Sequence, residues 1–442
     1  MQKSYRQLLL FAATIVFLAL APLVVFYAMG YRLADDAGES SIGVLLVETV
    51  PRRARISVNG RAVGTSPQSI ANLPPGEVTV VVEKEGYKSW QKKVAINATE
   101  VTELRGIRLF PDTLQSRTLL QSVELYSLSP NRQLLAAYSL GAVHIIDEDG
   151  SPLIQPVLLP HRPQPRELLW SPDSHSLLII DSDEVRLLNT SLPTQLRVIT
   201  ELFRARDIVW DPRIPGRLLA VSPAGHLIAY QSTTNSAAPL AENVSTFATS
   251  SRHIFAVQTN QQHLTVINVQ GQPIRTLTLP KKIKQLKVTP GGQAAVWYED
   301  GSLAIIGEAG QLIPVAPAAR SAGFSPDGQL LYVQTDDTSL HIFNISDERL
   351  RHIPLQQLYM VVRFSRPVRD PQWFAGGQHI MYQVEDEIII TEIDTRDHPV
   401  SYTADSTNLG SSRPSVGRDG DYLFYLKNYA GSSALVATAL TV

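Results

Sequence analysis

A short turn motif that recurs about every 41 residues constrains this 442-residue chain more than any other feature. Its clearest copy is Ser325-Pro326-Asp327-Gly328, which the apolar run LLYVQT follows after one residue. This order is typical of a type I turn, because proline fixes φ at about −65° and glycine is favoured at the last position. The place of the proline recurs at residues 130, 172, 212, 250, 290, 326, 375 and 418.

Each copy of the turn precedes two short apolar strands, such as LLAAYS at 134–139 and AVHIID at 142–147, with no helical period. Small sheets bury their faces and protect their edges when they pack around a common axis. We therefore expect an all-β region, a β-propeller of eight four-stranded blades. The fourth copy, Ala248–Arg252, is degenerate, so seven blades are the alternative. The recurring turn prolines are interpreted as structural: Pro130, Pro172, Pro212, Pro290 and Pro326.

The last blade has room for only three strands before Val442. A fourth must come from elsewhere, and RTLLQ at 117–121 precedes the first turn. We predict that the two ends of the propeller meet in one blade. The tryptophans before three of the turns (Trp170, Trp210 and Trp373) are predicted to pack in the core.

These turns and strands resemble the TolB-type propeller repeat, a relative of the WD-type repeat, over residues 118–442. Propellers of this type also precede hydrolase domains, which need a Gly-x-Ser-x-Gly elbow and a following α/β domain. This sequence shows neither, and its lack of cysteine excludes thiol chemistry. We therefore predict no enzyme, no catalytic residue, no metal site and no cofactor.

Residues 43–110 are expected to form a separate small β-sandwich, with strand-like runs at 44–50, 54–60, 77–87 and 90–97. The segment resembles the PEGA domain, an exported β-sandwich module, through ARISVNG at 54–60, GTSP at 64–67, LPPGE at 73–77 and KEGY at 84–87. The resemblance implies a structural or binding unit. Ten Lys and Arg against six Glu make it basic. Arg52, Arg53 and Arg55 could bind an anionic surface polymer or headgroups, or simply keep the domain soluble.

Residues 8–29 carry no charge and are long enough, as a helix of about 33 Å, to cross a bilayer. Lys3 and Arg6 precede this run, which predicts that residues 1–7 stay in the cytoplasm. A cleaved signal peptide is the alternative. After a linker at 30–42, the bulk of the chain would then lie outside the cytoplasm, as a single-pass protein of the cell membrane in a bacterial envelope.

The near-balance of 39 basic and 41 acidic residues argues against a nucleic-acid partner. The leading hypothesis is a scaffold that binds envelope or surface proteins, or an anionic surface polymer, through one propeller face. The alternative is an enzyme or ligand sensor with a site in the central channel. Five arginines near the start of the first strands could form a cationic ring at the channel mouth, or each could pair with a neighbouring acid: Arg166, Arg206, Arg320, Arg369 and Arg413.

Overall fold

The computed structural model describes residues 14–18, 20–21, 24–25, 42–160, 164–191, 196–307, 309–347, 350, 352–406, 409, 413–429 and 431–442. Within the predicted membrane helix at 8–29, the described residues 14–18, 20–21 and 24–25 are helical, and the others lie outside the described residues. So do residues 1–7 and nearly all of the predicted linker. In the described part of the chain, no helix is both long and apolar enough to span a membrane.

The chain divides into two compact units, each described here by itself. The first contains Met1–Thr113 with Thr395–Val400 and Val442, and the second contains Leu114–Asp394 with Ser401–Thr441.

The first unit contains a β-sandwich of two sheets. A three-stranded sheet has the order β4-β1-β7 and a four-stranded sheet the order β3-β2-β5-β6. The strands are β1 (Gly43–Val50), β2 (Arg55–Val58), β3 (Arg61–Thr65), β4 (Gln68–Leu73), β5 (Gly76–Glu83), β6 (Trp90–Ile96) and β7 (Val101–Arg108). The sheets bury one shared core, in which Leu45, Ile56 and Trp90 are almost fully covered. Strand β1 pairs antiparallel with β4 and parallel with β7.

The turn predicted at Asn59-Gly60 joins β2 to β3, and both residues have positive φ, as a two-residue hairpin loop requires. Strands β3, β4 and β7 were not predicted. The pattern of exposure explains β3 and β4, because neither alternates regularly between buried and exposed residues.

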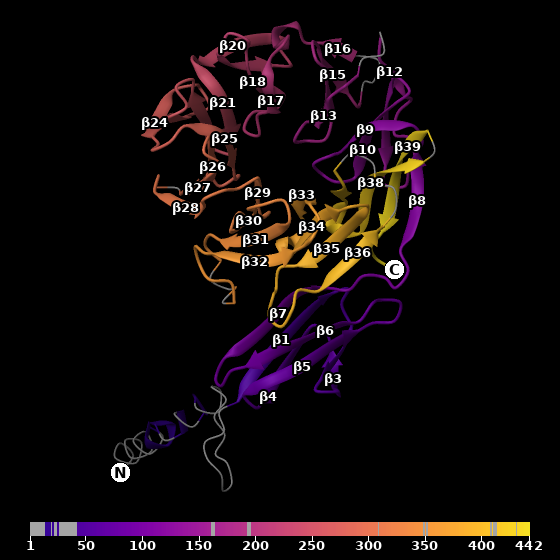
Figure 1. Cartoon of the computed structure of the whole chain (residues 1–442), viewed down its shortest axis with the longest axis vertical. Helices are drawn as coiled ribbons and strands as arrows, with labels where there is room; N and C mark the ends of the chain where they lie inside the picture. The colour runs from indigo at the N-terminus through magenta and orange to yellow at the C-terminus, as the bar shows by residue number, and fades with distance from the viewer. Residues whose placement is uncertain are drawn as a thin grey trace, which may run out of the picture. The chain divides into compact units, whose positions relative to one another are not determined.

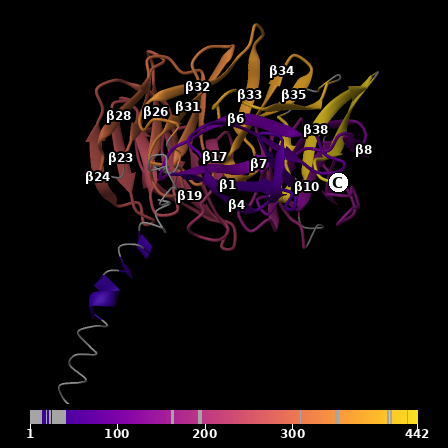
Figure 2. The ribbon, with the colours of Figure 1, turned by 90° about the horizontal axis from the view of Figure 1, so that it is seen from below.

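From Gln115 onward, the described residues form eight four-stranded antiparallel sheets, the blades of a propeller. Figure 1 shows them arranged in a circle, and Figure 2 shows the same blades after a 90° turn. The all-β class and the eight-blade expectation therefore agree with the structure. The fourth blade, whose turn is degenerate in sequence, is complete.

The strands of blades 1 to 4 are β9 (Val123–Leu128), β10 (Leu134–Ser139), β11 (Ala142–Asp147), β12 (Val157–Leu158); β13 (Glu167–Trp170), β14 (Ser176–Ile180), β15 (Val185–Asn189), β16 (Leu196–Val198); β17 (Arg206–Trp210), β18 (Arg217–Val221), β19 (Leu227–Gln231), β20 (Ser236–Ala241); and β21 (Val244–Thr249), β22 (Ile254–Gln258), β23 (His263–Ile267), β24 (Pro273–Thr278). The 3-10 helix η1 (Thr200–Leu202) lies between blades 2 and 3 in sequence.

The strands of blades 5 to 8 are β25 (Ile283–Val288), β26 (Ala294–Tyr298), β27 (Leu303–Ile306), β28 (Leu312–Ala316); β29 (Ser321–Phe324), β30 (Leu330–Gln334), β31 (Ser339–Asn344), β32 (Leu358–Arg363); β33 (Val368–Trp373), β34 (His379–Val384), β35 (Glu387–Glu392), β36 (Ser401–Asp405); and β37 (Ser415–Val416), β38 (Tyr422–Tyr429), β39 (Ser432–Ala439), β8 (Gln115–Leu120). Short 3-10 helices replace the turn in blades 7 and 8: η2 (Ala375–Gly377) and η3 (Arg418–Gly420).

Strand β8 closes the circle, because it pairs antiparallel with β39 at the other end of the propeller sequence. This confirms that the two ends meet in one blade. The hydroxyl of Tyr126 in blade 1 adds a second link by donating to the carbonyl of Phe424 in blade 8, at 2.8 Å.

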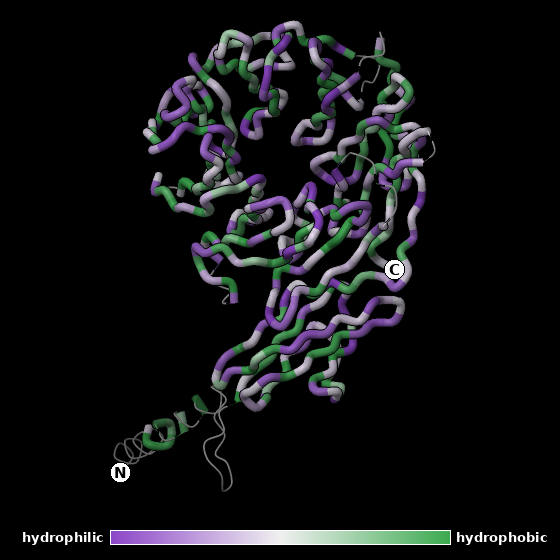
Figure 3. Tube along the Cα trace, in the orientation of Figure 1, coloured by the Kyte–Doolittle hydropathy of each residue, from purple (hydrophilic) through white to green (hydrophobic). Residues whose placement is uncertain are grey.

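The cores of the propeller lie mainly between neighbouring blades, so hydrophobic residues are spread around the whole circle (Figure 3). The three predicted core tryptophans join blades in one way. Each indole Nε1 donates to a carbonyl in the first strand of an earlier blade: Trp170 to Ser127, Trp210 to Leu169, and Trp373 to Gly323. Trp170 and Trp210 are buried and Trp373 is partly buried, as expected of structural side chains.

One backbone hydrogen bond repeats at the turn between the first and second strands of every blade. The N–H of what we term the turn residue donates to the carbonyl of a residue at or next to the start of the second strand, at 2.8 to 2.9 Å. The turn residues are Ser129, Ser171, Asp211, Ser250, Thr289, Ser325, Phe374 and Gly417. In the clearest copy, the Ser325 side chain also accepts from the Leu330 N–H and donates to Asp327. The N–H of Gly328 donates to the Ser325 carbonyl, which closes the predicted turn.

Candidate functional site

The two ends of each blade face opposite sides of the propeller, because neighbouring strands in a blade are antiparallel. We call the side with the eight turns the turn face. The loop face is the opposite side, where the first strands begin and where the second and third strands are joined. First strands of adjacent blades lie near one another around the axis (Figure 1).

Two positions in each first strand carry partly or fully exposed side chains, although the second strands beside them are almost entirely buried. Because these side chains lie on the inner strands and still reach solvent, we interpret them as facing the propeller axis. The first axial position lies four residues before the turn residue: Leu125, Glu167, Asp207, Thr246, Gln285, Ser321, Asp370 and Arg413. The second lies two residues before it: Ser127, Leu169, Val209, Ala248, Lys287, Gly323, Gln372 and Ser415.

Side chains at the second axial position follow the inner edge of the circle. The Nζ of Lys287 donates to the carbonyl of Ala322 in the next blade, at 3.0 Å. The Nε2 of Gln372 donates to the carbonyl of Pro414 in the blade after it, at 2.6 Å. Both acceptors lie three residues before a turn residue, so the two contacts are equivalent. This repetition supports the axial placement, and it makes Lys287 the one charged side chain in a neutral set of eight.

The environment of Lys287 disfavours its positive charge. Burial by the surrounding blades, and then the charge of Arg413, lower the pKa of its ammonium group. Its Nζ also lies 5.7 Å from the centre of the Trp297 indole. A side chain that reaches solvent and is still surrounded by protein is expected inside a circle of blades.

The charged pair of Arg413 and Asp370 and the neutral Tyr332 belong to the part of the axis near blades 6 to 8. The Nε of Arg413 pairs with the Asp370 carboxylate at 2.9 Å. Burial raises the pKa of Tyr332 to about 12, although the charge of Arg413 opposes this shift. Tyr332 therefore keeps its hydroxyl proton, and it packs against Trp373 with ring centres 6.4 Å apart.

Blades 2 and 3 contribute acidic groups to the same layer. Burial raises the pKa of Glu167, and the adjacent Arg166 partly offsets that effect. Asp207 occupies the corresponding position with φ at 55°, in a bulge of the first strand. Basic axial groups thus lie in blades 5 and 8, and acidic groups without an ion pair among the described residues lie in blades 2 and 3.

The five predicted arginines are all exposed on the loop face, and Arg206, Arg320, Arg369 and Arg413 each have a separate partner. Arg166, Arg206, Arg320 and Arg369 lie five residues before the turn residue, next to the first axial position. Arg206 donates to the Ser245 carbonyl at 2.5 Å, Arg320 pairs with Asp337 at 2.7 Å, and Arg369 donates to the Glu385 carbonyl. Only Arg413 occupies an axial position. Its positive charge acts to lower the pKa of both Lys287 and Tyr332, two groups that sequence reasoning missed.

The other predicted site residues are simpler to place. Arg52, Arg53 and Arg55 are exposed in the sandwich, and Arg55 lies opposite Glu83 on the neighbouring strand. Among the described residues, no cluster of three or more His, Asp or Glu could hold a metal ion.

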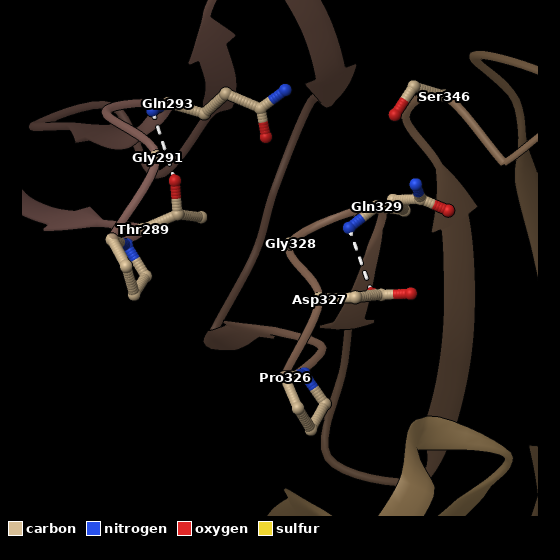
Figure 4. Close-up of a pocket in the computed structure, with 9 residues that line it drawn as sticks. Thr289, Gly291, Gln293, Pro326, Asp327, Gly328, Gln329 and Ser346 are labelled. Carbon is tan, nitrogen blue, oxygen red and sulfur yellow. Dashed lines mark hydrogen bonds between the residues drawn. The ribbon is translucent and has the colours of Figure 1, made fainter.

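A hollow of about 190 Å³ lies on the turn face between blades 5 and 6 (Figure 4). Residues of the two turns line it, and the side chains of Thr289 and Asp327 each accept a backbone N–H of their own turn, from Gln293 and Gln329. Because the Thr289 and Asp327 side chains already form hydrogen bonds within their own turns, the propeller axis is the stronger candidate site.

The loop face also exposes large hydrophobic side chains. Leu140 is 76% exposed and Leu158 is 77% exposed, both in blade 1. They lie close together, because Leu158 pairs with Ala142 and the Leu159 N–H donates to the Gly141 carbonyl. We call these two leucines the blade 1 patch. Phe203 and Tyr429, from the neighbouring blade 2 to 3 connection and blade 8, are about half exposed on the same face.

Comparison with known proteins supports both units. Residues 42–107 match the PEGA domain family. Among solved structures, the C-terminal WD40 domain of Sif2 is similar with a TM-score of 0.53, at 14% identity over 74% of this chain and 99% of that one. A eukaryotic initiation factor structure gives a TM-score of 0.52, at 14% identity over 69% of this chain and 81% of that one. No curated protein sequence matches the chain. The propeller therefore has a WD40-like fold.

Proposed function

We propose that this chain is a membrane-anchored, extracytoplasmic scaffold of the cell envelope, which binds a partner protein on the loop face of its propeller. Within the WD40-like class, its repeat is of the TolB type. The apolar run at residues 8–29 supports the anchor, and the positive charges before that run support an external propeller. The exposed Arg52, Arg53 and Arg55 are a secondary surface for anionic polymer or lipid.

The observation that carries the binding proposal is the conformation of Leu140. Ser139 pairs with Ala142, so Leu140 and Gly141 form a two-residue hairpin loop, with φ at 52° and 84°. Such loops favour Asn-Gly, because a residue with a branched side chain is strained at positive φ. Leucine here is both strained and exposed, and neither property stabilises the blade. Strain of this kind is concentrated at functional sites.

The neighbouring Leu158 makes the blade 1 patch a hydrophobic surface rather than one isolated side chain. Exposed apolar surface favours a protein partner over a carbohydrate polymer, because burial of leucine against another protein removes apolar area from water.

Replacement of Leu140 by asparagine tests this proposal. Leu140→Asn should keep or raise the unfolding temperature, since asparagine tolerates positive φ, and it should abolish partner binding. Leu153→Asn is the matched control, because Leu153 is an exposed leucine of the same blade beyond the opposite end of β11. Photo-crosslinking from position 140 of the full chain in membranes should capture one protein, identified by mass spectrometry, that position 153 does not.

Equal crosslinking from positions 140 and 153, or undiminished capture of the same partner by Leu140→Asn, would contradict partner binding at the blade 1 patch. The anchor has a separate test. A protease added to cells with a permeabilised outer layer and an intact cell membrane should degrade the propeller, whereas protection of the propeller would place it inside.

The alternative function is a ligand sensor with its site on the propeller axis. The charged axial side chains, above all Lys287 and Glu167 with their shifted pKa values, favour this second candidate.

A further inference from the structure

We infer that Lys287, Arg413 and Tyr332 form a carboxylate-binding site on the propeller axis, on the side of blades 5 to 8. This site is separate from the blade 1 patch, and the inference does not depend on partner binding at that patch.

The side chains of Lys287 and Tyr332 both reach the short strand β29 of blade 6. The Nζ of Lys287 lies 3.0 Å from the carbonyl oxygen of Ala322 in β29. Tyr332 lies over the next residue, Gly323, because a Cβ atom placed on Gly323 would be 2.6 Å from Cε1 of the tyrosine and 3.0 Å from its hydroxyl oxygen. The absence of a side chain at Gly323 thus lets a tyrosine from the second strand lie across the first. Its hydroxyl and the lysine ammonium group meet the same strand at consecutive residues.

Blades 5 to 8 carry an excess of positive charge at their axial positions. The axial positions of blades 5 to 8 hold two cations, Lys287 and Arg413, and one anion, Asp370. Asp370 pairs with Arg413. In the part of the chain that the structure describes, no carboxylate lies within ion-pair distance of Lys287, whose Nζ contacts only a carbonyl oxygen and an indole face. A partly desolvated ammonium group without a counter-ion is unfavourable, and a bound anion removes this cost.

The charges and the donor groups of this site suit a carboxylate better than a phosphate. One excess positive charge matches a monoanion, and the Tyr332 hydroxyl, which stays protonated, can donate to a carboxylate oxygen. A phosphate dianion would be repelled by Asp370 beside Arg413 and by Glu167 and Asp207 from the other blades. The geometry therefore favours a carboxylate, such as an acidic side chain or a chain terminus of a peptide.

Acylation of lysine in the full-length protein tests this site. Lysines are modified with a limiting amount of an amine-acylating reagent at low ionic strength, and the rate at each lysine is measured by mass spectrometry. The probes are N-acetyl-Gly-Glu-Gly-amide, with a side-chain carboxylate, and N-acetyl-Gly-Gly-Gly, with a terminal one. N-acetyl-Gly-Gln-Gly-amide is the neutral control, and inorganic phosphate is the competing anion. Lys284 is the internal control, because it is an exposed lysine of the same strand.

We expect one or both acidic probes to slow acylation of Lys287 about threefold at twice their Kd, without an effect on Lys284. The more protective probe identifies the source of the carboxylate. Equal slowing at Lys284, equal slowing by the glutamine peptide, stronger slowing by phosphate, or no slowing at all would each overturn the inference.

Two variants extend the test. Arg413→Gln removes an exposed side chain, so the protein should fold, and the protection of Lys287 by the better probe should fall several-fold. Gly323→Ala places a methyl group against Tyr332 and should weaken protection while leaving Lys287 and Arg413 present. Unchanged protection of Lys287 in both variants would show that Arg413 and Tyr332 do not take part in carboxylate binding. None of these measurements needs the protein partner. If the carboxylate site fails its test, partner binding at the blade 1 patch still stands, and the carboxylate site likewise stands if partner binding fails.

Discussion

The turn end of the first strands and their axial positions differ in how much repeats from blade to blade. At the turn end, the same backbone hydrogen bond forms in all eight blades, although the turn residue is Ser, Thr, Asp, Phe or Gly. At the axial positions, the backbone also repeats, but the side chains range from glycine and alanine to lysine, arginine and glutamate. The backbone repeat therefore defines the fold, whereas departures from the repeat in side-chain chemistry indicate where this propeller acquires a function of its own.

The largest expected effect is at the one turn that depends on buried charge. Asp211 is 2% exposed, and its carboxylate accepts from the Nε of Arg213 at 2.7 Å and from the Nε of Arg217 at 2.6 Å. Asp211→Ala would leave two buried guanidinium groups without their counter-ion, which should lower the free energy of unfolding by about 3–5 kcal/mol. Chemical denaturation measures this loss.

Ser325→Ala is the matched control for this comparison. It removes the side-chain bonds of a turn without buried charge and should cost about 1 kcal/mol. Similar losses in the two variants would show that the blade 3 turn behaves like the others and that its ion pairs add nothing.

The next effect in size is at the closure of the circle. Tyr126→Phe removes hydrogen bonds from blade 1 to the carbonyls of Phe424 and Arg413 in blade 8, at 2.8 Å and 2.7 Å. We expect a loss of about 1–2 kcal/mol and faster amide hydrogen exchange in β9 and β38.

Tyr230→Phe is the control, because the Tyr230 hydroxyl bonds to Asn235 within blade 3. Its effect on exchange should be confined to β19 and β20. Faster exchange at the closure in this variant, or none there in Tyr126→Phe, would contradict a closing role for Tyr126.

Much of the fold could be predicted from the sequence, because the turn end is local. Ser-Pro-Asp-Gly specifies its turn within four residues, and its recurrence gives eight blades even where Ala248–Arg252 is a poor copy. The closing strand was also predictable, from a count of strands before Val442. By contrast, β12 and β16 have only two or three residues, and the proline-containing segments around them give no clear period.

The candidate site was harder to predict because it depends on register and on three separate blades. The arginines were found as a recurring residue type, but four of them lie one residue before the first axial position, and three of these four bind elsewhere. Alignment of the first strands on their turn residues would have found Lys287 as the charged member of a neutral set. It would not have found Tyr332, which comes from a second strand and reaches the axis only because residue 323 is glycine.

The smallest expected effect tests the axial end through pH. Burial raises the pKa of Glu167, so between the unfolded and folded values of that pKa the native state holds more protons than the unfolded chain. Stability contributed by this group is therefore present at low pH and lost as the pH rises through the folded pKa. Glu167→Gln removes the charge, and it should stabilise the protein at pH 7 by less than about 1 kcal/mol, because the carboxylate still contacts solvent. Below about pH 3, where the carboxyl is neutral in both states, the variant and the original protein should unfold alike. A gain of the same size at both pH values would mean that Glu167 is an ordinary packed side chain, and blade 2 would then contribute no charge to the axial layer.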